Sequence, residues 1–169
     1  MVLKSNSRGG DRTVDHMDRK ILSALRADGR LTMNELAEKV GLSPSPCWTR
    51  VKRLEKIGAI QHYAAVLDHD VLGLSNTVFV EVMLDTHSDD ALEAFGAALS
   101  RMPEVIEAHL VSGDYDYLVK VAVVDTADYE RFLRQRLYKT EGVRHTKSIF
   151  ALRAMKKGFS IDPLAVPGG

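Results

Sequence analysis

Two hydrophobic periods divide the chain. Up to about residue 57, apolar residues recur every three or four positions, which is the spacing of one face of an α-helix. Between residues 77 and 152, short β-prone runs of alternating apolar residues are separated by segments with helical spacing. The change of period predicts a helical N-terminal domain followed by a second domain of mixed helices and strands.

Capping residues set the expected bounds of the first two helices. Asp15 can accept a backbone N–H and is expected to cap a helix that ends near Asp28. Thr32 and Glu35 have the spacing of a capping box, which predicts a second, short helix that Gly41 ends.

Ser43 and Pro44 suit the cap and the first position of a third helix, which is expected to run to about Ile57. A β-prone run from Ile60 to Leu67 follows it. Three helices and a strand in this order predict a winged helix-turn-helix. Apolar Cys47, Val51 and Leu54 share one face of the third helix, whereas the other face carries Ser45, Trp48, Thr49, Lys52 and Lys56. Hydroxyl groups, an aromatic ring and cations are suited to phosphates and base edges.

The second half reads as β-α-β-β-α-β. The expected strands are residues 77–84, 104–112, 116–124 and 143–152. Asp89 and Asp90 are expected to cap the first helix and Asp125 the second. This order of elements predicts a ferredoxin-like sheet, so the chain as a whole belongs to the α+β class.

Both faces of the predicted sheet are apolar. The face for the two helices carries Val78, Val80, Val82, Leu84, Tyr117, Val119, Val121 and Val123. The opposite face is expected to carry Phe79, Met83, Leu118, Ala122 and, if the strand register allows it, Phe150, among charged residues. With both helices already used, this second face predicts a twofold dimer formed sheet to sheet.

Charge is balanced overall but not locally. The 169 residues include 23 Lys and Arg and 23 Asp and Glu, giving a formal net charge of zero. Residues 50–56 nevertheless place Arg50, Lys52, Arg53 and Lys56 against a single acid, Glu55. A basic stripe on a solvated helix is common, but within a helix-turn-helix it favours DNA contact.

Several classes of protein are disfavoured. No apolar run approaches the length of a membrane span, and the first twelve residues lack the apolar core of a signal peptide. A single cysteine, Cys47, leaves no disulfide framework and is expected to be core filler. Neither metal-ligand spacing nor a catalytic motif occurs, so we expect no metal, no cofactor and no enzymatic activity. A soluble, intracellular protein is the expectation.

Several segments match one family when they are taken together in order. They are DRKIL (18–22), DGRL (28–31), ELA (35–37), VGLSPSPC (40–47), RVKRL (50–54), GAI (58–60) and HLVSGDYDYLVK (109–120). The chain resembles the Lrp/AsnC, or feast/famine, family of transcription regulators. The resemblance implies binding to double-stranded DNA, dimers that can assemble into octamers, an amino acid or related metabolite as effector, and a cytoplasmic, nucleoid-associated location.

With the resemblance, the domain boundaries become specific. Residues 1–13 are expected to be a flexible tail, 14–67 the winged helix-turn-helix with its helix-turn-helix at about 34–53, and 68–76 a hinge. Residues 77–157 would form the RAM domain, which binds the effector and mediates oligomerisation, and residues 158–169 a second tail.

The family pattern also assigns candidate site residues. For DNA they are Ser43, Ser45, Trp48, Thr49, Arg50, Lys52, Arg53 and Lys56. For the effector, between RAM domains of neighbouring subunits, they are Ser112, Gly113, Asp114, Tyr115, Asp116, Thr126, Ile149, Phe150 and Ala151. One of Asp114 and Asp116 is expected to be a structural turn residue and the other to bind an effector ammonium group.

Two other functions stay open at this point. The ferredoxin-like domain could serve a metabolic or small-molecule-binding protein that does not bind specific DNA, although no catalytic constellation supports this. An architectural DNA-bending protein is disfavoured by the neutral charge. Trp48 could equally be a packing anchor, and Arg50 lies between the two faces of its helix.

Overall fold

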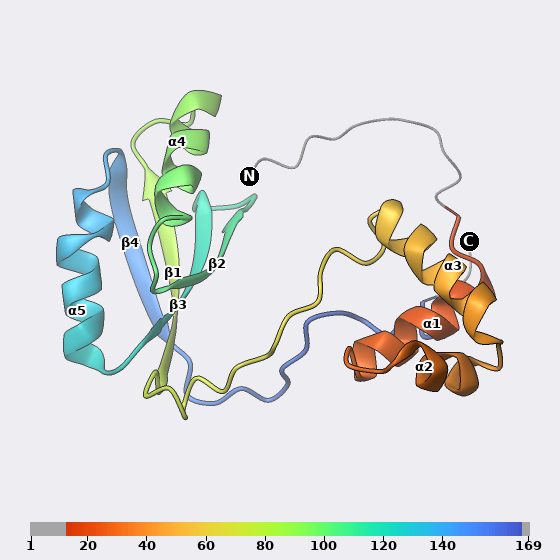
Figure 1. Ribbon diagram of the computed structural model, residues 1–169. Helices are drawn as coiled ribbons and strands as arrows, with labels where there is room; N and C mark the ends of the chain where they lie inside the picture. Colours follow the sequence, from red (N-terminus) through yellow and green to blue (C-terminus); the bar gives the residue numbers. More distant parts are fainter. Residues whose placement is uncertain (1–12, 167–169) are drawn as a thin grey trace. The chain divides into compact units, whose positions relative to one another are not determined.

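The computed structural model describes residues 13–166 and divides the chain into two compact units (Figure 1). The first unit comprises residues 1–66 together with 157–169, and the second comprises residues 67–156. Most of the predicted N-terminal tail lies outside the described residues.

Three helices make the first unit: α1 (His16–Ala27), α2 (Met33–Val40) and α3 (Pro44–Lys56). Asp15 caps α1, the Thr32–Glu35 capping box begins α2, and Gly41 ends α2 at φ 75°. These three expectations are confirmed. Ser43 occupies the N-cap position of α3 and Pro44 the first helical position, as predicted, although the Ser43 side chain makes no capping hydrogen bond.

The core of the first unit is small. Its buried apolar residues are Ile21, Ala24, Leu36, Ala37, Val40, Cys47, Val51 and Leu54. Cys47 is buried as expected, and desolvation raises the pKa of its thiol, so the reactive thiolate is disfavoured.

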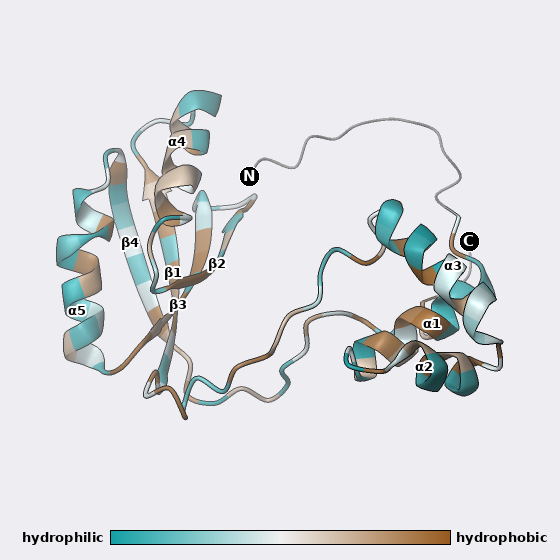
Figure 2. Cartoon of the chain, in the orientation of Figure 1, coloured by the Kyte–Doolittle hydropathy of each residue, from teal (hydrophilic) through white to brown (hydrophobic). Residues whose placement is uncertain are grey.

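The expected wing strand over Ile60–Leu67 is not formed: residues 61–68 have no regular secondary structure. A β-strand needs a neighbouring strand to satisfy its N–H and C=O groups, and none among the described residues pairs with this segment. Tyr63, Val66 and Leu67 in this segment are exposed, and the chain after α3 carries brown, hydrophobic positions in Figure 2.

The segment from Lys157 onward returns to the first unit. The Arg19 guanidinium of α1 donates to the carbonyl oxygens of Pro163 and Val166, at 3.0 and 2.8 Å, and Arg26 pairs with Asp162 at 3.5 Å. The sequence predicts a tail here because the segment has no periodicity, but it docks through backbone carbonyls that any residue type provides.

A four-stranded antiparallel sheet forms the second unit. Its strands are β1 (Asn76–Leu84), β2 (Val105–Leu110), β3 (Tyr117–Val123) and β4 (Val143–Phe150), in the order β2-β3-β1-β4. With α4 (Asp89–Leu99) and α5 (Thr126–Gln135), this is the predicted ferredoxin-like arrangement. A short 3-10 helix, Leu137–Lys139, follows α5.

Helix α5 has the predicted N-cap residue, whereas helix α4 has a different one. Asp125 accepts the Asp128 N–H at the start of α5, as expected. At α4 the cap is Ser88, whose hydroxyl accepts the Ala91 N–H at 3.3 Å, and Asp89 and Asp90 lie inside the first turn. The prediction for α4 is therefore wrong by one residue, since three consecutive residues there are all good cap formers.

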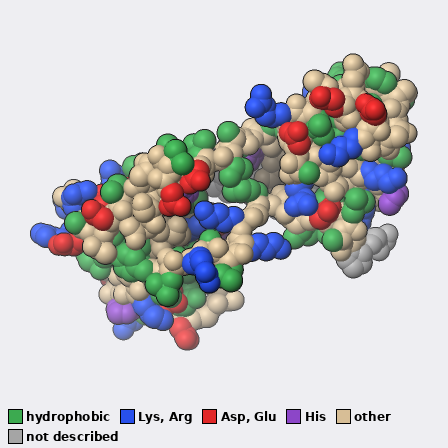
Figure 3. Space-filling model, turned by 90° about the horizontal axis from the view of Figure 1, so that it is seen from below, with side chains coloured by type: hydrophobic (Ala, Val, Ile, Leu, Met, Phe, Trp, Pro, Cys, Tyr) green, Lys and Arg blue, Asp and Glu red, His purple; other side chains and the backbone are tan. Residues whose placement is uncertain are grey.

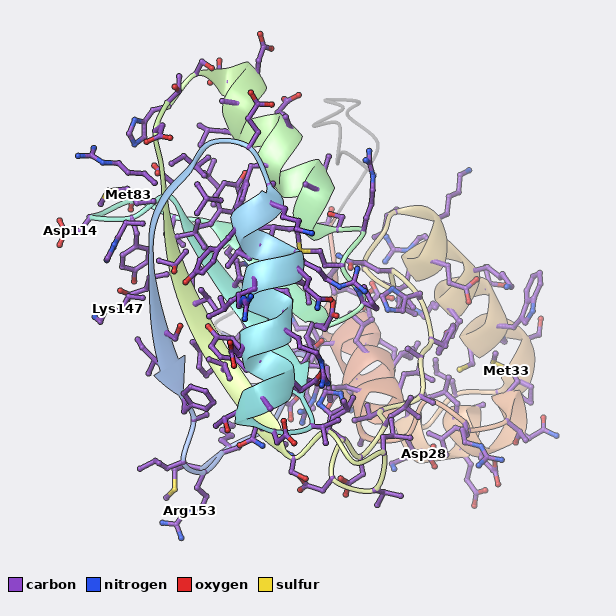
Figure 4. The ribbon with its side chains drawn as sticks, turned by 90° about the vertical axis from the view of Figure 1, so that its left-hand side faces the viewer. Asp28, Met33, Met83, Asp114, Lys147 and Arg153 are labelled. Carbon is purple, nitrogen blue, oxygen red and sulfur yellow. The ribbon has the colours of Figure 1, made fainter. Side chains whose placement is uncertain are left out.

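Helices α4 and α5 cover the same face of the sheet (Figure 4). Phe95 and Leu99 of α4 and Tyr129 and Phe132 of α5 pack against the buried faces of β1 and β3. Phe150 was expected on the opposite face, but its register with Val78 places it on the helix side.

The Phe150 ring meets the Tyr129 ring edge to face, with 5.2 Å between the ring centroids, which is a favourable geometry for an aromatic pair. Ile149 takes its place on the open face. The uncovered face of the sheet therefore keeps Phe79, Met83, Leu118 and Ile149, together with the ion pairs Lys120–Glu107 and Lys147–Glu81.

Candidate functional site

The outward face of α3 collects most of the predicted DNA-contacting residues. Cys47, Val51 and Leu54 face the core at spacings of four and three residues, which leaves the other side of the helix in solvent. The exposed residues on that side are Ser43, Ser45, Trp48, Thr49, Lys52 and Lys56. The indole of Trp48 is 53% exposed, so it is not a packing anchor within the described residues of this unit.

Two of these polar groups already have partners within the helix. The Thr49 hydroxyl donates to the Ser45 carbonyl at 3.1 Å, and Lys52 pairs with Glu55 at 2.8 Å, which raises the lysine pKa. Such surface pairs are weak and screened by salt, so a phosphate can replace Glu55. Both side chains remain available to a ligand.

Arg50 and Arg53 behave differently from the rest of the predicted set. The Arg50 Nη1 donates to Asp15 at 2.7 Å and to Asp18 at 2.8 Å, while Arg53 pairs with Asp18 and donates to the Thr13 carbonyl at 3.1 Å. Both guanidinium groups therefore bind α1 or the residues just before it.

This cluster is held by charge as well as by geometry. The Asp18 N–H, the Arg50 hydrogen bond and the positive charge of Arg50 lower the pKa of Asp15 to about 2. Asp18, although ionisable, is completely buried. Sequence reasoning assigned no role to Asp15 beyond capping and none to Asp18. The available signal was an acid next to the apolar stripe of α1, at a position three before buried Ile21.

In the second unit, Asp114 and Asp116 lie in the loop between β2 and β3, and Asp116 is the one with a structural role. The Asp116 carboxylate accepts the Leu84 N–H at 2.8 Å and lies 3.1 Å from His87 Nε2, and its side chain is only 14% exposed. Asp114 points away from the sheet into solvent (Figure 4). Gly113 has a φ of 136°, a region that residues with a Cβ rarely adopt. Asp116 thus fixes the loop, whereas the Asp114 side chain is exposed to solvent.

The remaining effector candidates lie at the other end of the sheet. The loop of residues 112–116 precedes β3, whereas Thr126 follows it, and the seven-residue strand separates them by roughly 20 Å. Ile149 and Ala151 lie at the Thr126 end, since β4 runs antiparallel to β1 and its last residues pair near Thr77. One copy of the chain therefore does not bring all nine candidates together.

Charged side chains on the surface are mixed rather than gathered by sign. The face in Figure 3 shows Lys, Arg, Asp and Glu side chains interspersed with apolar ones, without a large patch of one sign. No cluster of three metal-ligating side chains occurs in residues 13–166, and no helix in that range could cross a bilayer.

Comparison with known proteins decides the family. A profile for a winged helix-turn-helix DNA-binding domain matches residues 14–61, and one for the Lrp/AsnC ligand binding domain matches residues 77–161. The leucine-responsive regulatory protein of Salmonella typhimurium is 42% identical over 156 residues, which are 92% of this chain and 94% of that protein. The chain belongs to the Lrp/AsnC family.

Two solved structures extend the match to three dimensions. A transcriptional regulator from Neisseria meningitidis, in complex with L-Met, has a TM-score of 0.83 at 37% identity, covering 88% of this chain and 96% of that one. A feast or famine regulatory protein from M. tuberculosis, complexed with L-methionine, has a TM-score of 0.80 at 33% identity, covering 89% and 100%. This Lrp/AsnC protein is therefore a transcription regulator with a DNA-binding unit and a ligand-binding, or effector, unit.

Proposed function

We propose that this Lrp/AsnC protein binds DNA in the major groove through the outward face of α3. The supporting observation is the exposure of Trp48, Thr49 and Lys52 on a helix whose opposite face is fully buried. Ser43, Ser45 and Lys56 extend the same face toward its two ends. Arg50 and Arg53 act indirectly, because their guanidinium groups are paired with α1.

A second copy of the chain completes the effector site in this proposal. The loop of residues 112–116 from one copy would meet the end of the sheet that carries Thr126, Ile149 and Ala151 from another, with Phe150 supporting that end from the helix side. The roughly 20 Å strand between the two groups supports a shared site. A homo-oligomer also presents two copies of α3 to a symmetric DNA site.

An amino acid is the ligand class that this arrangement favours. The Asp114 carboxylate can accept the α-ammonium group, while Ser112, Gly113 and Tyr115 surround it in the same loop. The L-methionine complexes of two relatives support this class and make methionine the first compound to test. We further propose that the protein is not an enzyme and acts in the bacterial cytoplasm on the nucleoid.

DNA binding is tested with a duplex that the wild-type protein selects from a random-sequence pool. Lys52→Ala should weaken binding in fluorescence anisotropy and reduce the salt slope by about one, because one phosphate contact is lost. Lys139→Ala removes an equal charge from the effector unit and should leave both values unchanged. An unaltered affinity and slope for Lys52→Ala would refute the assignment of the face.

Effector binding is tested by repeating the titration with methionine and the other amino acids. Asp114→Ala should abolish the response to the active amino acid while DNA affinity without ligand stays at the wild-type value. Retention of a normal response would remove Asp114 from the site. A response that requires no second copy, shown by ligand binding to a monomeric fraction, would contradict the shared pocket.

A further inference from the structure

We propose that Asp18 is a positioning residue for the DNA-binding helix, and that it determines how well the protein discriminates its own site from other DNA. This inference rests on the proposed role of α3. Asp18 does not touch the outward face itself. It acts through Arg50 and Arg53, which belong to α3 and lie next to the residues that face DNA.

The burial of Asp18 is unusual for a charged side chain. It is 0% exposed, and it is the one polar or charged residue in the buried set of residues 13–166. An ionised carboxylate is kept in such a place only when its lone pairs are satisfied. Here Oδ1 accepts Arg50 at 2.8 Å, and Oδ2 accepts both Arg53 and the Asp15 N–H, the latter at 3.0 Å.

The two arginines make this contact directional. They are three residues apart on α3, so they emerge on the same side of the helix one turn apart. One carboxylate that holds both of them fixes the rotation of α3 about its own axis. The apolar contacts of Cys47, Val51 and Leu54 select which face of α3 turns inward, and the hydrogen bonds to Asp18 add a tighter constraint, because burial is non-directional whereas hydrogen bonds have strict angles.

The rotation of α3 decides where the outward side chains point. Base readout requires side-chain groups to reach base edges within hydrogen-bonding distance, so a small rotation of the helix displaces Trp48, Thr49 and Lys52 together. Contacts to phosphates tolerate such a displacement better, since they depend mainly on charge. Loss of Asp18 should therefore reduce specific binding more than non-specific binding.

Charge reinforces this difference. The guanidinium side chains of Arg50 and Arg53 are 33% and 35% exposed, and Asp15 and Asp18 balance their charges. If Asp18 lost its charge, an arginine at the edge of the DNA-facing surface would become a free cation. Such a cation strengthens attraction to any phosphate backbone and leaves sequence reading unimproved.

The experiment measures binding of the full-length chain to two duplexes at several salt concentrations. One duplex is selected from a random pool by the wild-type protein, and the other has the same composition in scrambled order. Asp18→Asn keeps the shape of the side chain and removes its charge. We expect affinity for the selected duplex to fall about tenfold or more, affinity for the scrambled duplex to stay equal or rise, and its salt slope to steepen by about one.

Asp90→Asn is the matched control, because it makes the same chemical change on an exposed residue in the first turn of α4. Its affinities for both duplexes should equal those of the wild type. The Asp18 proposal is overturned if Asp18→Asn leaves the ratio of the two affinities unchanged, either because neither falls or because both fall in step.

A second variant keeps the test informative if Asp18→Asn does not fold by circular dichroism. Arg53→Lys retains a positive partner for Asp18 but replaces the planar fork by a point charge with looser geometry. The ratio of affinities should again fall, and a wild-type ratio overturns the proposal. Lys52→Ala distinguishes failure of the proposed DNA-binding face from failure of the Asp18 proposal. If Lys52→Ala weakens binding and the Asp18 and Arg53 variants do not, the DNA-binding face stands and the role of Asp18 is refuted.

Discussion

The effector unit buries thirteen residues in one cluster that spans a sheet and two helices, and all of them are apolar or aromatic. The DNA-binding unit buries eight apolar residues in its cluster and adds the buried Asp18 with its two arginines. A sheet fixes the relative positions of its strands through regular backbone hydrogen bonds, whereas three short helices have no such ladder between them. The smaller unit therefore uses a polar cluster to set an orientation that the larger unit obtains from its backbone.

The largest effect should come from the apolar core of the effector unit. Leu99→Ala removes a completely buried side chain between α4 and the sheet, and we expect a loss of about 2–5 kcal/mol in the free energy of unfolding of that unit. Denaturant unfolding followed by Trp48 fluorescence reports on the other unit alone. If the transition seen by Trp48 shifts as much as the circular-dichroism transition, the two cores are not independent.

A smaller loss should follow from the loop of the effector unit. Asp116→Ala leaves the Leu84 N–H without its acceptor and removes the His87 contact, which should cost about 1–3 kcal/mol in thermal or denaturant unfolding. Asp114→Ala is the matched control and should leave unfolding unchanged, because its side chain projects into solvent (Figure 4). Equal losses for the two variants would show that Asp116 does not fix the loop.

The two serine caps provide a finer comparison of the units. Ser88→Ala removes a hydroxyl that accepts the Ala91 N–H and should destabilise the effector unit by about 1 kcal/mol. Ser43→Ala removes a hydroxyl that makes no capping hydrogen bond, so the change in unfolding free energy should be at most a few tenths of that value. The opposite order would mean that Ser43 caps α3 in solution.

Acid should affect the DNA-binding unit through Asp15. Its pKa is lowered from 3.8 to about 2 in the folded state, so its stabilising contribution is complete above pH 4 and is lost as the pH falls toward 2. Thermal unfolding followed by Trp48 fluorescence should show a midpoint that decreases over this range. Asp15→Asn should flatten that dependence, and an equally steep decrease in the variant would assign it to other carboxylates.

Elements whose information is local could be predicted from the sequence. The capping box of Thr32 and Glu35, the stop at Gly41 and the buried face of α3 each depend on residues within one or two turns. The order of the sheet also follows, because βαββαβ leaves few other topologies.

Features that depend on distant partners were missed. Whether Ile60–Leu67 forms a strand depends on a neighbouring strand, and the face of Phe150 depends on the register between β4 and β1. Arg50 and Arg53 bind Asp18 instead of pointing into solvent, and these contacts join residues more than thirty positions apart in the sequence. The effector candidates were chosen by residue type and family pattern. In the structure they form two groups at opposite ends of the sheet, so a single chain does not bring them into one site.

The docking of residues 157–166 on α1 has a consequence for the order of synthesis. The carbonyl groups of Pro163 and Val166 that receive Arg19 are synthesised after every residue of the effector unit. All of residues 67–156 are made before them and can fold as they emerge, since domains generally fold as units during translation. The DNA-binding unit, although it is begun first, is therefore completed after the effector unit, and a chain that terminates before residue 157 lacks part of the DNA-binding unit.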